Sequence, residues 1–134
     1  MINSKTNLKD FVTETGGLPS ESVEEVQNPA AFELSNIQRG LILVFARWSP
    51  IPLLCLQRMR DIVPSRLAKA KAKLYVIDND KLNPREMERL FGRVLHGGAE
   101  TFAVVGGRVR VDSTGCPEDY EALILKLCDA LSQD

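Results

Sequence analysis

Residues 41–52 read LILVFARWSPIP, an apolar run that ends in a tryptophan and a turn. Six consecutive apolar residues, 41–46, fit a β-strand that is covered on both faces, as in the centre of an α/β sheet. Residues 48–50 then turn the chain, because proline and serine favour turns. The pattern over 51–67 is helical, and we expect Pro64 to kink or end that helix.

The other elements are predicted on both sides of this strand. In chain order they are a short amphipathic helix over 5–14, a brief strand at Val23 and Val26, a helix that begins at Pro29 and ends at Arg39-Gly40, a buried strand over 74–77, a short helix over 84–91, two strands over 101–105 and 108–111 joined by Gly106-Gly107, and a last helix that begins at Pro117.

This order is β-α-β-α-β-α-β-β-α with one helix in front. Two βαβ passages require parallel strands with right-handed crossovers, and the late hairpin adds antiparallel strands. The prediction is therefore an α/β fold with a mixed sheet of four or five strands and helices on both faces. We expect residues 1–19 to form a helical extension and residues 20–134 to form one domain.

The composition narrows the classes of function. The chain has 134 residues, 44% of them hydrophobic and 26% charged, with a net charge of −1. Such a chain has no long-range field that favours nucleic acid or an anionic membrane. The first residues have no apolar core of a secretory signal, and we interpret the basic cluster over 66–73 as a solvated helix end. We expect a cytoplasmic protein with no nucleic-acid or membrane partner.

The three cysteines are Cys55, Cys116 and Cys128, an odd number whose spacings match no zinc or disulfide framework. Cys55 and Cys128 fall in predicted helices beside apolar neighbours, so we interpret them as buried small hydrophobes. The only histidine, His96, cannot form a metal site by itself and is given no catalytic role. We expect no metal and no cofactor.

The element order, with a tryptophan directly after the central strand, resembles thioredoxin from about Ser20 to Ser132. The segments that carry the resemblance are LILVFARWSPIP, LYVID, GGAETFAVVGGRVRVDSTG and the terminal amphipathic helix. In that family a Trp-Cys-Gly-Pro-Cys motif follows the central strand. Here the motif reads Trp48-Ser49-Pro50-Ile51-Pro52, so the tryptophan remains and both cysteines are gone.

The resemblance implies that dithiol–disulfide chemistry is absent. That chemistry needs a thiolate that attacks a disulfide and a second thiol that resolves the mixed disulfide, and Ser49 and Pro52 supply neither. Leu43 stands where the family carries a buried acid, and Glu100 stands where it carries a cis-proline. A cis bond before a non-proline residue is costly, so we expect a trans bond and a reshaped loop at Glu100. No catalytic residue is assigned, and an enzyme is the less expected class.

The resemblance also implies that three loops, 48–52, 97–101 and 114–117, meet at the carboxyl edge of the sheet and receive a partner polypeptide. The candidate binding surface consists of Trp48, Ser49, Pro50, Ile51, Ala99, Glu100, Gly115 and Cys116. The alternative for Trp48 is that it packs inward as a lid over the sheet. The chain also resembles the cysteine-less accessory proteins of bacterial hydrogenases at residues 17–19 and 91–92, and departs from them at Glu100. We therefore expect a protein-binding chaperone or assembly factor.

Two other functions stay open. Cys116 lies before Pro117 at the expected N-cap of the last helix, where unpaired amides lower a cysteine pKa, so a one-cysteine thiol oxidoreductase is the alternative. The protein could instead be an interaction protein whose partner face lies elsewhere, at the helix around Phe11 or at a dimer contact. The oligomeric state is not predicted.

Overall fold

The computed structural model describes residues 7–132. Its five-stranded sheet has the order β1-β3-β2-β4-β5. The strands β1, β3 and β2 are parallel, whereas β4 is antiparallel to β2 and β5 is antiparallel to β4. The strands are β1 (Val23–Glu25), β2 (Arg39–Phe45), β3 (Lys73–Asp78), β4 (Thr101–Val105) and β5 (Arg108–Ser113).

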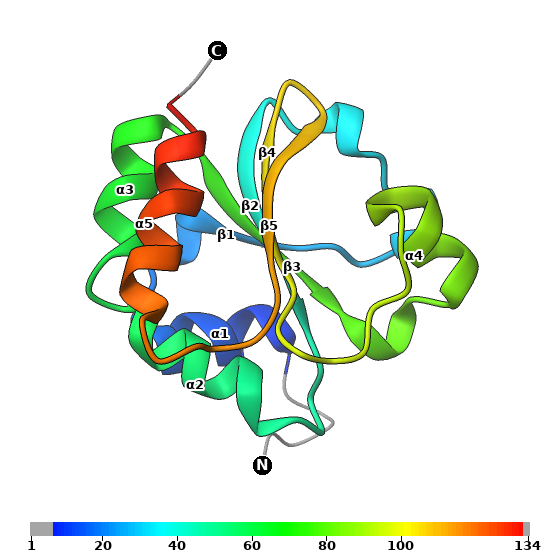
Figure 1. Cartoon of the computed structure of the whole chain (residues 1–134), viewed down its shortest axis with the longest axis horizontal. Coiled ribbons are helices and arrows are strands. Elements are labelled where there is room, and N and C mark those ends of the chain that lie inside the picture. The colour runs from blue at the N-terminus through cyan, green and yellow to red at the C-terminus, as the bar shows by residue number, and fades with distance from the viewer. Residues whose placement is uncertain (1–6, 133–134) are drawn as a thin grey trace.

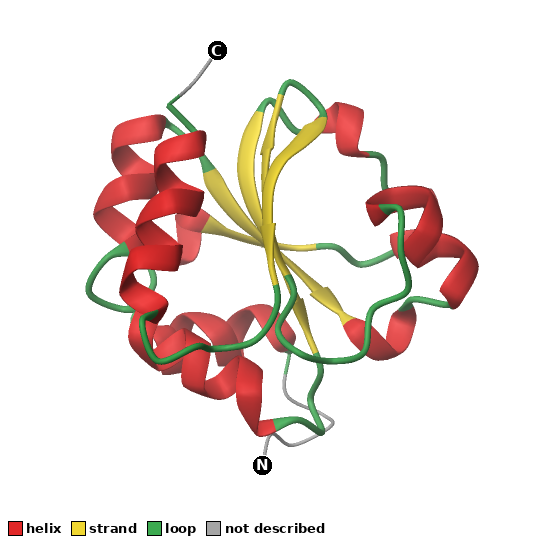
Figure 2. Ribbon diagram, viewed as in Figure 1, coloured by secondary structure: helices red, strands yellow, loops and turns green. Residues whose placement is uncertain are grey.

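Helices cover both faces of this sheet (Figures 1 and 2). One face carries α1 (Leu8–Gly16), α2 (Pro50–Met59), α3 (Val63–Ala70) and α5 (Tyr120–Ala130), and the other carries α4 (Pro84–Phe91). Four short 3-10 turns complete the chain at 20–22, 29–31, 34–36 and 79–81. The predicted α/β class, with a mixed sheet between two layers of helices, is confirmed.

The central strand β2 separates two apolar cores. Leu41, Leu43 and Phe45 belong to the core under α1, α2, α3 and α5. Ile42 and Val44 belong to the core on the α4 side. Because successive side chains of a strand point to opposite faces, an unbroken apolar run is what a strand buried on both sides requires. The sequence-based prediction for this strand is confirmed.

Two predicted helices have different forms in the structure. The helix predicted from Pro29 is wrong, because only short 3-10 turns form there. Phe32 and Leu34 both pack against the α4-side core. Because residues two apart lie on different sides of an α-helix, a continuous α-helix would not place both side chains on that core. The helix predicted over 51–67 is two helices, with a break after Met59, and Pro64 lies in the first turn of α3. A first-turn proline loses no helical hydrogen bond, so Pro64 starts the second helix rather than kinking it.

The N-terminal helix is packed into the same core as the rest of the chain. Leu8 and Val12 are fully buried, and Phe11 meets Phe45 edge to face at 5.8 Å between ring centroids. The predicted boundary at residue 19 therefore falls at a turn and not at a gap in the core. Residues 5 and 6, where we predicted that this helix begins, lie outside the described residues.

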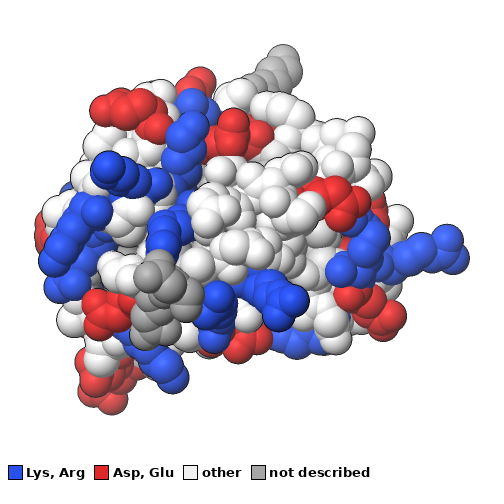
Figure 3. Space-filling view, turned by 90° about the horizontal axis from the view of Figure 1, so that it is seen from above, with Lys and Arg blue, Asp and Glu red and all other residues white. Residues whose placement is uncertain are grey.

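The end of the molecule where α3 and α5 finish carries the basic cluster predicted over 66–73. Figure 3 looks onto this end and shows Lys and Arg side chains gathered on the α3 side. Arg66 pairs with Asp129 at 3.3 Å between Nη1 and Oδ1, which fits a solvated helix end. Within residues 7–132, no helix is both long and apolar enough to cross a membrane.

The β4–β5 hairpin offers a paired test of the fold. Gly106 and Gly107 both have positive φ, 59° and 78°. A Cβ on Gly107 would lie 2.9 Å from the Cα of Ser35, whereas one on Gly106 would meet nothing within 4 Å. We expect Gly106→Ala to lower the free energy of unfolding by about 1 kcal/mol through backbone strain. Gly107→Ala should cost about 1–3 kcal/mol more, because backbone must also move.

Urea unfolding of the two variants and the wild type measures this difference. Equal losses in both variants would contradict the close approach of the hairpin to Ser35.

Candidate functional site

Three loops meet where β2 and β3 end, at the lower edge of Figure 1. Gly97 lies against the Trp48 ring, because a Cβ there would come within 2.4 Å of Cη2. The Gly115 amide donates a hydrogen bond to the Gly98 carbonyl, and a Cβ on Gly98 would lie 3.1 Å from Cγ2 of Thr114. The fold thus brings together the loops at 46–49, 97–100 and 114–116.

Trp48 is held in place but is not buried. Its side chain is 54% exposed, and its indole N–H donates to Oδ1 of Asp80 at 3.0 Å. Its ring rests against Gly97, where any larger residue would collide with it. Trp48 therefore does not form a lid over the sheet. It presents an apolar ring to solvent in a defined orientation.

Three further apolar residues lie in the first two turns of α2, which begins directly after the Trp48 turn. Pro50 and Leu54 are four residues apart and Ile51 and Leu54 three apart, so they share one side of the helix. Leu54 is 51% exposed, Pro50 is exposed and Ile51 is half-buried. We call Trp48, Pro50, Ile51 and Leu54 the apolar strip. Leu54 is not among the residues predicted for the binding surface, although its spacing of three from Ile51 in the predicted helix was the available signal.

Three residues predicted on the binding surface, Ser49, Ala99 and Glu100, are buried, which corrects that prediction. Ala99 is 0% exposed and Glu100 is 1% exposed, so neither can contact a partner. The Glu100 carbonyl accepts from the Val44 amide, which draws this residue into the sheet edge. Its carboxylate turns inward, where Oε2 accepts from the His96 amide at 3.0 Å and Oε1 has no hydrogen-bond partner among the described residues.

The loop before Glu100 has the unusual backbone that the missing proline suggested. No peptide bond in the described chain is cis, so the bond before Glu100 is trans. Ala99 has a φ of 59°, a left-handed conformation that is uncommon for a residue with a Cβ. This part of the loop stores local strain, which proteins tolerate where the surrounding structure fixes it.

Cys116 does not lie at a helix terminus, so the prediction that it occupies the N-cap of the last helix is wrong. The last helix has its N-cap at Asp119 and begins at Tyr120. Cys116 is half-buried in the loop before it. Its sulfur lies 3.6 Å from Nη1 of Arg58, which comes from α2. The positive group beside this thiol is thus a guanidinium and not the end of a helix.

Arg58 is fixed from several sides. It pairs with Glu121 at 2.6 Å between Nη2 and Oε2 and donates to the carbonyls of Pro117 and Glu118. Its guanidinium also lies over the Tyr120 ring, 5.5 Å from the centroid. These contacts place the positive charge beside the Cys116 thiol.

A second thiol reaches the same place from the middle of α2. The buried Cys55 donates to the carbonyl of Gly115 at 3.7 Å. Burial raises the pKa of Cys55 to about 12, and the neighbouring Cys116 adds to this rise. Tyr120 is the third member, since its pKa is raised by burial and then by Cys55. We call Cys55, Cys116 and Tyr120 the thiol cluster.

The thiol cluster has one unsatisfied group. Tyr120 is fully buried, and its hydroxyl makes no hydrogen bond of ordinary geometry with the described residues. Cys128 lies apart from this cluster, in α5 beside Arg66 and Asp129, and burial raises its pKa to about 11. Within residues 7–132, no group of three or more His, Cys, Asp or Glu side chains could hold a metal ion.

The comparisons with known proteins give structural matches only. No protein-family model matches the chain, and no curated protein sequence matches it. Thioredoxin of Malassezia sympodialis superposes with a TM-score of 0.63 at 13% identity, over 82% of this chain and 91% of that one. A mutant thioredoxin from Halobacterium salinarum superposes with a TM-score of 0.59 at 16% identity, over 85% of this chain and 94% of that one. Thioredoxin 3 from Saccharomyces cerevisiae mitochondria superposes with a TM-score of 0.56 at 13% identity, over 81% of this chain and 96% of that one.

The chain has a thioredoxin fold. Ser49 is buried, and its hydroxyl accepts from the Ile51 amide at 3.3 Å as the N-cap of α2. Pro52 is buried in the first helical turn. In this structure both residues help to start a helix.

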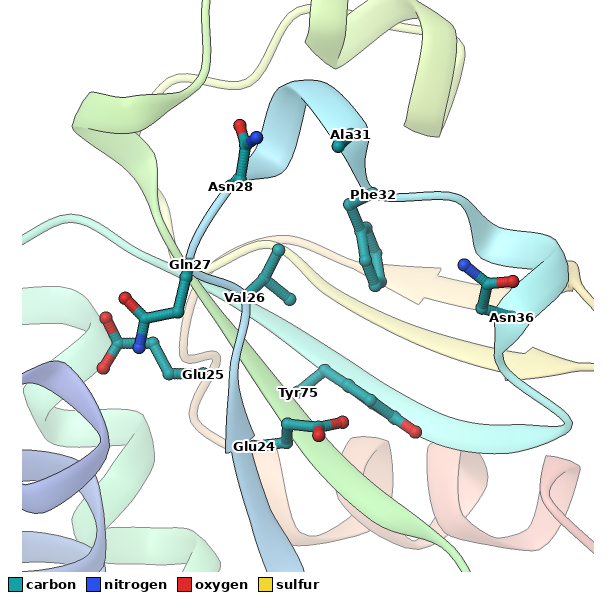
Figure 4. Close-up of a pocket in the computed structure, with 9 residues that line it drawn as sticks. All are labelled: Glu24, Glu25, Val26, Gln27, Asn28, Ala31, Phe32, Asn36 and Tyr75. Atoms are coloured by element: carbon teal, nitrogen blue, oxygen red, sulfur yellow. The ribbon is translucent and has the colours of Figure 1, made fainter.

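A hollow of about 260 Å³ lies elsewhere on this thioredoxin fold, beside β1 (Figure 4). Phe32 and Tyr75 project into it, with 6.4 Å between their ring centroids. Burial raises the pKa of Tyr75, and Glu24 adds to this effect. None of the lining residues belongs to the three loops, so the hollow is separate from the apolar strip.

Substitution of Gly97 tests the fixed orientation of Trp48. Gly97 and Gly92 both have a φ of 76°, but only at Gly97 would a Cβ meet the indole, since nothing lies within 4 Å of a Cβ on Gly92. Trp48 is the only tryptophan in the chain, so fluorescence that is excited at wavelengths beyond the tyrosine absorption reports it alone. We expect Gly97→Ala to change the emission maximum and the iodide quenching of Trp48, because the ring must move.

Gly92→Ala is the matched control, with the same backbone strain and no contact with the ring. Unchanged fluorescence in Gly97→Ala, or equal changes in both variants, would show that Gly97 does not support Trp48.

Proposed function

We propose that this protein binds an extended apolar segment of another protein at the apolar strip, and that it performs no dithiol–disulfide exchange at residues 49–52. The observation that carries the proposal is the exposure of Trp48, just before α2, and of Leu54, within α2, both more than half accessible. Exposed apolar groups gathered in one place mark contact surfaces more often than chance. Tryptophan is also among the residues that contribute most to binding energy.

The charges around the strip favour an uncharged occupant. Asp80 accepts the indole hydrogen bond at one end of the strip. At the other end, Arg58 is compensated by Glu121. Because Arg58 is already paired within its own chain, it gains little from a charged partner, and the free energy of binding comes mainly from apolar area.

An assembly chaperone of the cytoplasm is the role that we propose for this binding activity. A chaperone holds an apolar segment of another protein without chemistry, which matches an apolar surface beside an inactive motif. The resemblance of residues 17–19 and 91–92 to hydrogenase accessory proteins supports hydrogenase maturation as one such role.

Peptide selection tests the binding surface. The immobilised protein is used to select from a random peptide library, and the affinity of the selected peptide is then measured for each variant. We expect an apolar, extended peptide, and we expect Trp48→Ala and Leu54→Ala each to weaken binding about tenfold or more, since each removes a large exposed contact. Val109→Ala is the control, because Val109 is an exposed apolar residue of β5, 37% accessible, outside the strip.

Failure to select any peptide would count against the proposal. Equal losses in Val109→Ala and Trp48→Ala would place the binding surface elsewhere.

Insulin reduction in the presence of dithiothreitol tests the proposed lack of dithiol exchange. We expect the wild type to add nothing to the rate with dithiothreitol alone, because Ser49 and Pro52 have no thiol. The double variant Ser49→Cys/Pro52→Cys is the positive control, since it restores two cysteines at the motif positions of this fold. Wild-type turnover that approaches a dithiol thioredoxin would contradict the proposal.

A one-cysteine thiol oxidoreductase is the second candidate, and the contact between Arg58 and Cys116 favours it. The Arg58 guanidinium lies 3.6 Å from the sulfur, and the thiolate is the reactive form of cysteine. Alkylation of Cys116 by iodoacetamide, followed against pH in the wild type and in Arg58→Gln, tests this candidate. A thiolate that forms only above about pH 8.5, unchanged by the substitution, would leave the candidate without support.

A further inference from the structure

Two cysteines that are far apart in the sequence share one small environment. Cys55 donates to the carbonyl of Gly115, the residue directly before Cys116. Cys116 also acts electrostatically on Cys55, and both cysteines act on the buried Tyr120 hydroxyl. Only the fold brings these groups together, since α2 and the loop before α5 are joined through β3, α4 and the β4–β5 hairpin.

We propose that Cys55 and Cys116 form a reversible intrachain disulfide, a redox site outside the residue 49–52 motif. The inference does not rest on the proposed binding function. It rests on the proximity of the two thiols, on the access that solvent has to one of them, and on the charge beside it.

Cys55 lies in a helix and Cys116 lies in a loop, and this difference in backbone would allow a disulfide to form between them. Cys55 lies within α2, whose backbone is fixed by helical hydrogen bonds. Cys116 lies in an irregular loop after Gly115, which has a φ of 85° and open space where a Cβ would lie. A disulfide needs its two Cβ atoms about 3.5–4.5 Å apart, and a loop of this kind can adjust to meet that requirement.

The exposure of the two thiols determines which of them reacts first with an oxidant. Cys116 is half-buried and Cys55 is buried, so an external disulfide such as glutathione disulfide reaches Cys116 first. The Cys116 thiolate, beside Arg58, attacks one sulfur of the oxidant. The S–S bond of the oxidant breaks, a mixed disulfide forms at Cys116, and one glutathione leaves as a thiolate that takes up a proton.

The buried thiol then closes the bridge. Cys55 releases its proton to solvent and attacks the Cys116 sulfur, and the second glutathione leaves and is protonated. In sum, two protein thiols lose two electrons and two protons, and one disulfide oxidant becomes two thiols. Reduction by a small dithiol reverses these steps.

The surroundings of Cys55 make the second step the slow one. Burial is the main reason that the pKa of Cys55 is raised to about 12, and the charge of Cys116 is the next cause. The groups that face Cys55 are Cys116, Tyr120 and Arg58; the hydrogen bond from Tyr120 and the charge of Arg58 lower its pKa, but they do not offset burial. In the mixed disulfide Cys116 has no charge, so its contribution disappears, but burial remains. Closure should therefore accelerate as pH rises.

Oxidation of the reduced full-length chain with glutathione disulfide tests the inference. After denaturation we expect the three thiols of the chain to fall to one, with the monomer lighter by two hydrogen atoms and a peptide map that joins the segments of Cys55 and Cys116. Between pH 7 and pH 9, the rate of closure should rise about tenfold per pH unit, since this range lies below the raised pKa of Cys55.

Matched variants separate the pair from the third cysteine. Cys128→Ser should still form the bridge, because Cys128 lies beside Arg66 and Asp129, whereas Cys116→Ser and Cys55→Ser should not. If Cys55→Ser does not fold, the peptide map of the wild type decides. Three free thiols after oxidation, a stable glutathione adduct at Cys116 without closure at pH 9, or a bridge to Cys128 would overturn the inference.

Discussion

The burial of β2 on both faces is the constraint on which the rest of this structure depends. A strand between two cores has no place for an uncompensated charge, because an isolated buried charge is costly. Leu43 accordingly lies among apolar side chains of the core. Chemical groups can therefore appear only where the strand ends, and the loop at Trp48 and the first turn of α2 follow directly from that end.

Much of this fold could be predicted from local patterns. The apolar run of β2, the β3 strand, and the Gly106-Gly107 turn are local signals, and each is present in the structure. The sequence-based predictions were wrong where tertiary packing, and not the local sequence, determined the secondary structure. The segment after Pro29 is not an α-helix, because Phe32 and Leu34 both pack inward. The last helix begins at Tyr120 and not at Pro117, because Tyr120 is the residue that enters the core.

The site was predicted only in part, for a physical reason. Trp48 and Pro50 are exposed at the expected edge, since a turn after a buried strand has to reach the surface. Glu100 is buried, because its carbonyl pairs with Val44 and its side chain follows inward. The association of Cys55 with Cys116 could not be found by comparing spacings. It depends on how the β4–β5 hairpin returns the chain to α2, which no local pattern encodes.

The support of the Trp48 ring has an energetic consequence. A side chain that is mobile in the free protein loses about 0.5–1.5 kcal/mol of rotamer entropy when a partner immobilises it. Here Asp80 holds the indole nitrogen and Gly97 lies against the ring, so most of that loss has already occurred during folding. Trp48 is thus preorganised for binding, because Gly97 has no side chain that would displace the indole ring.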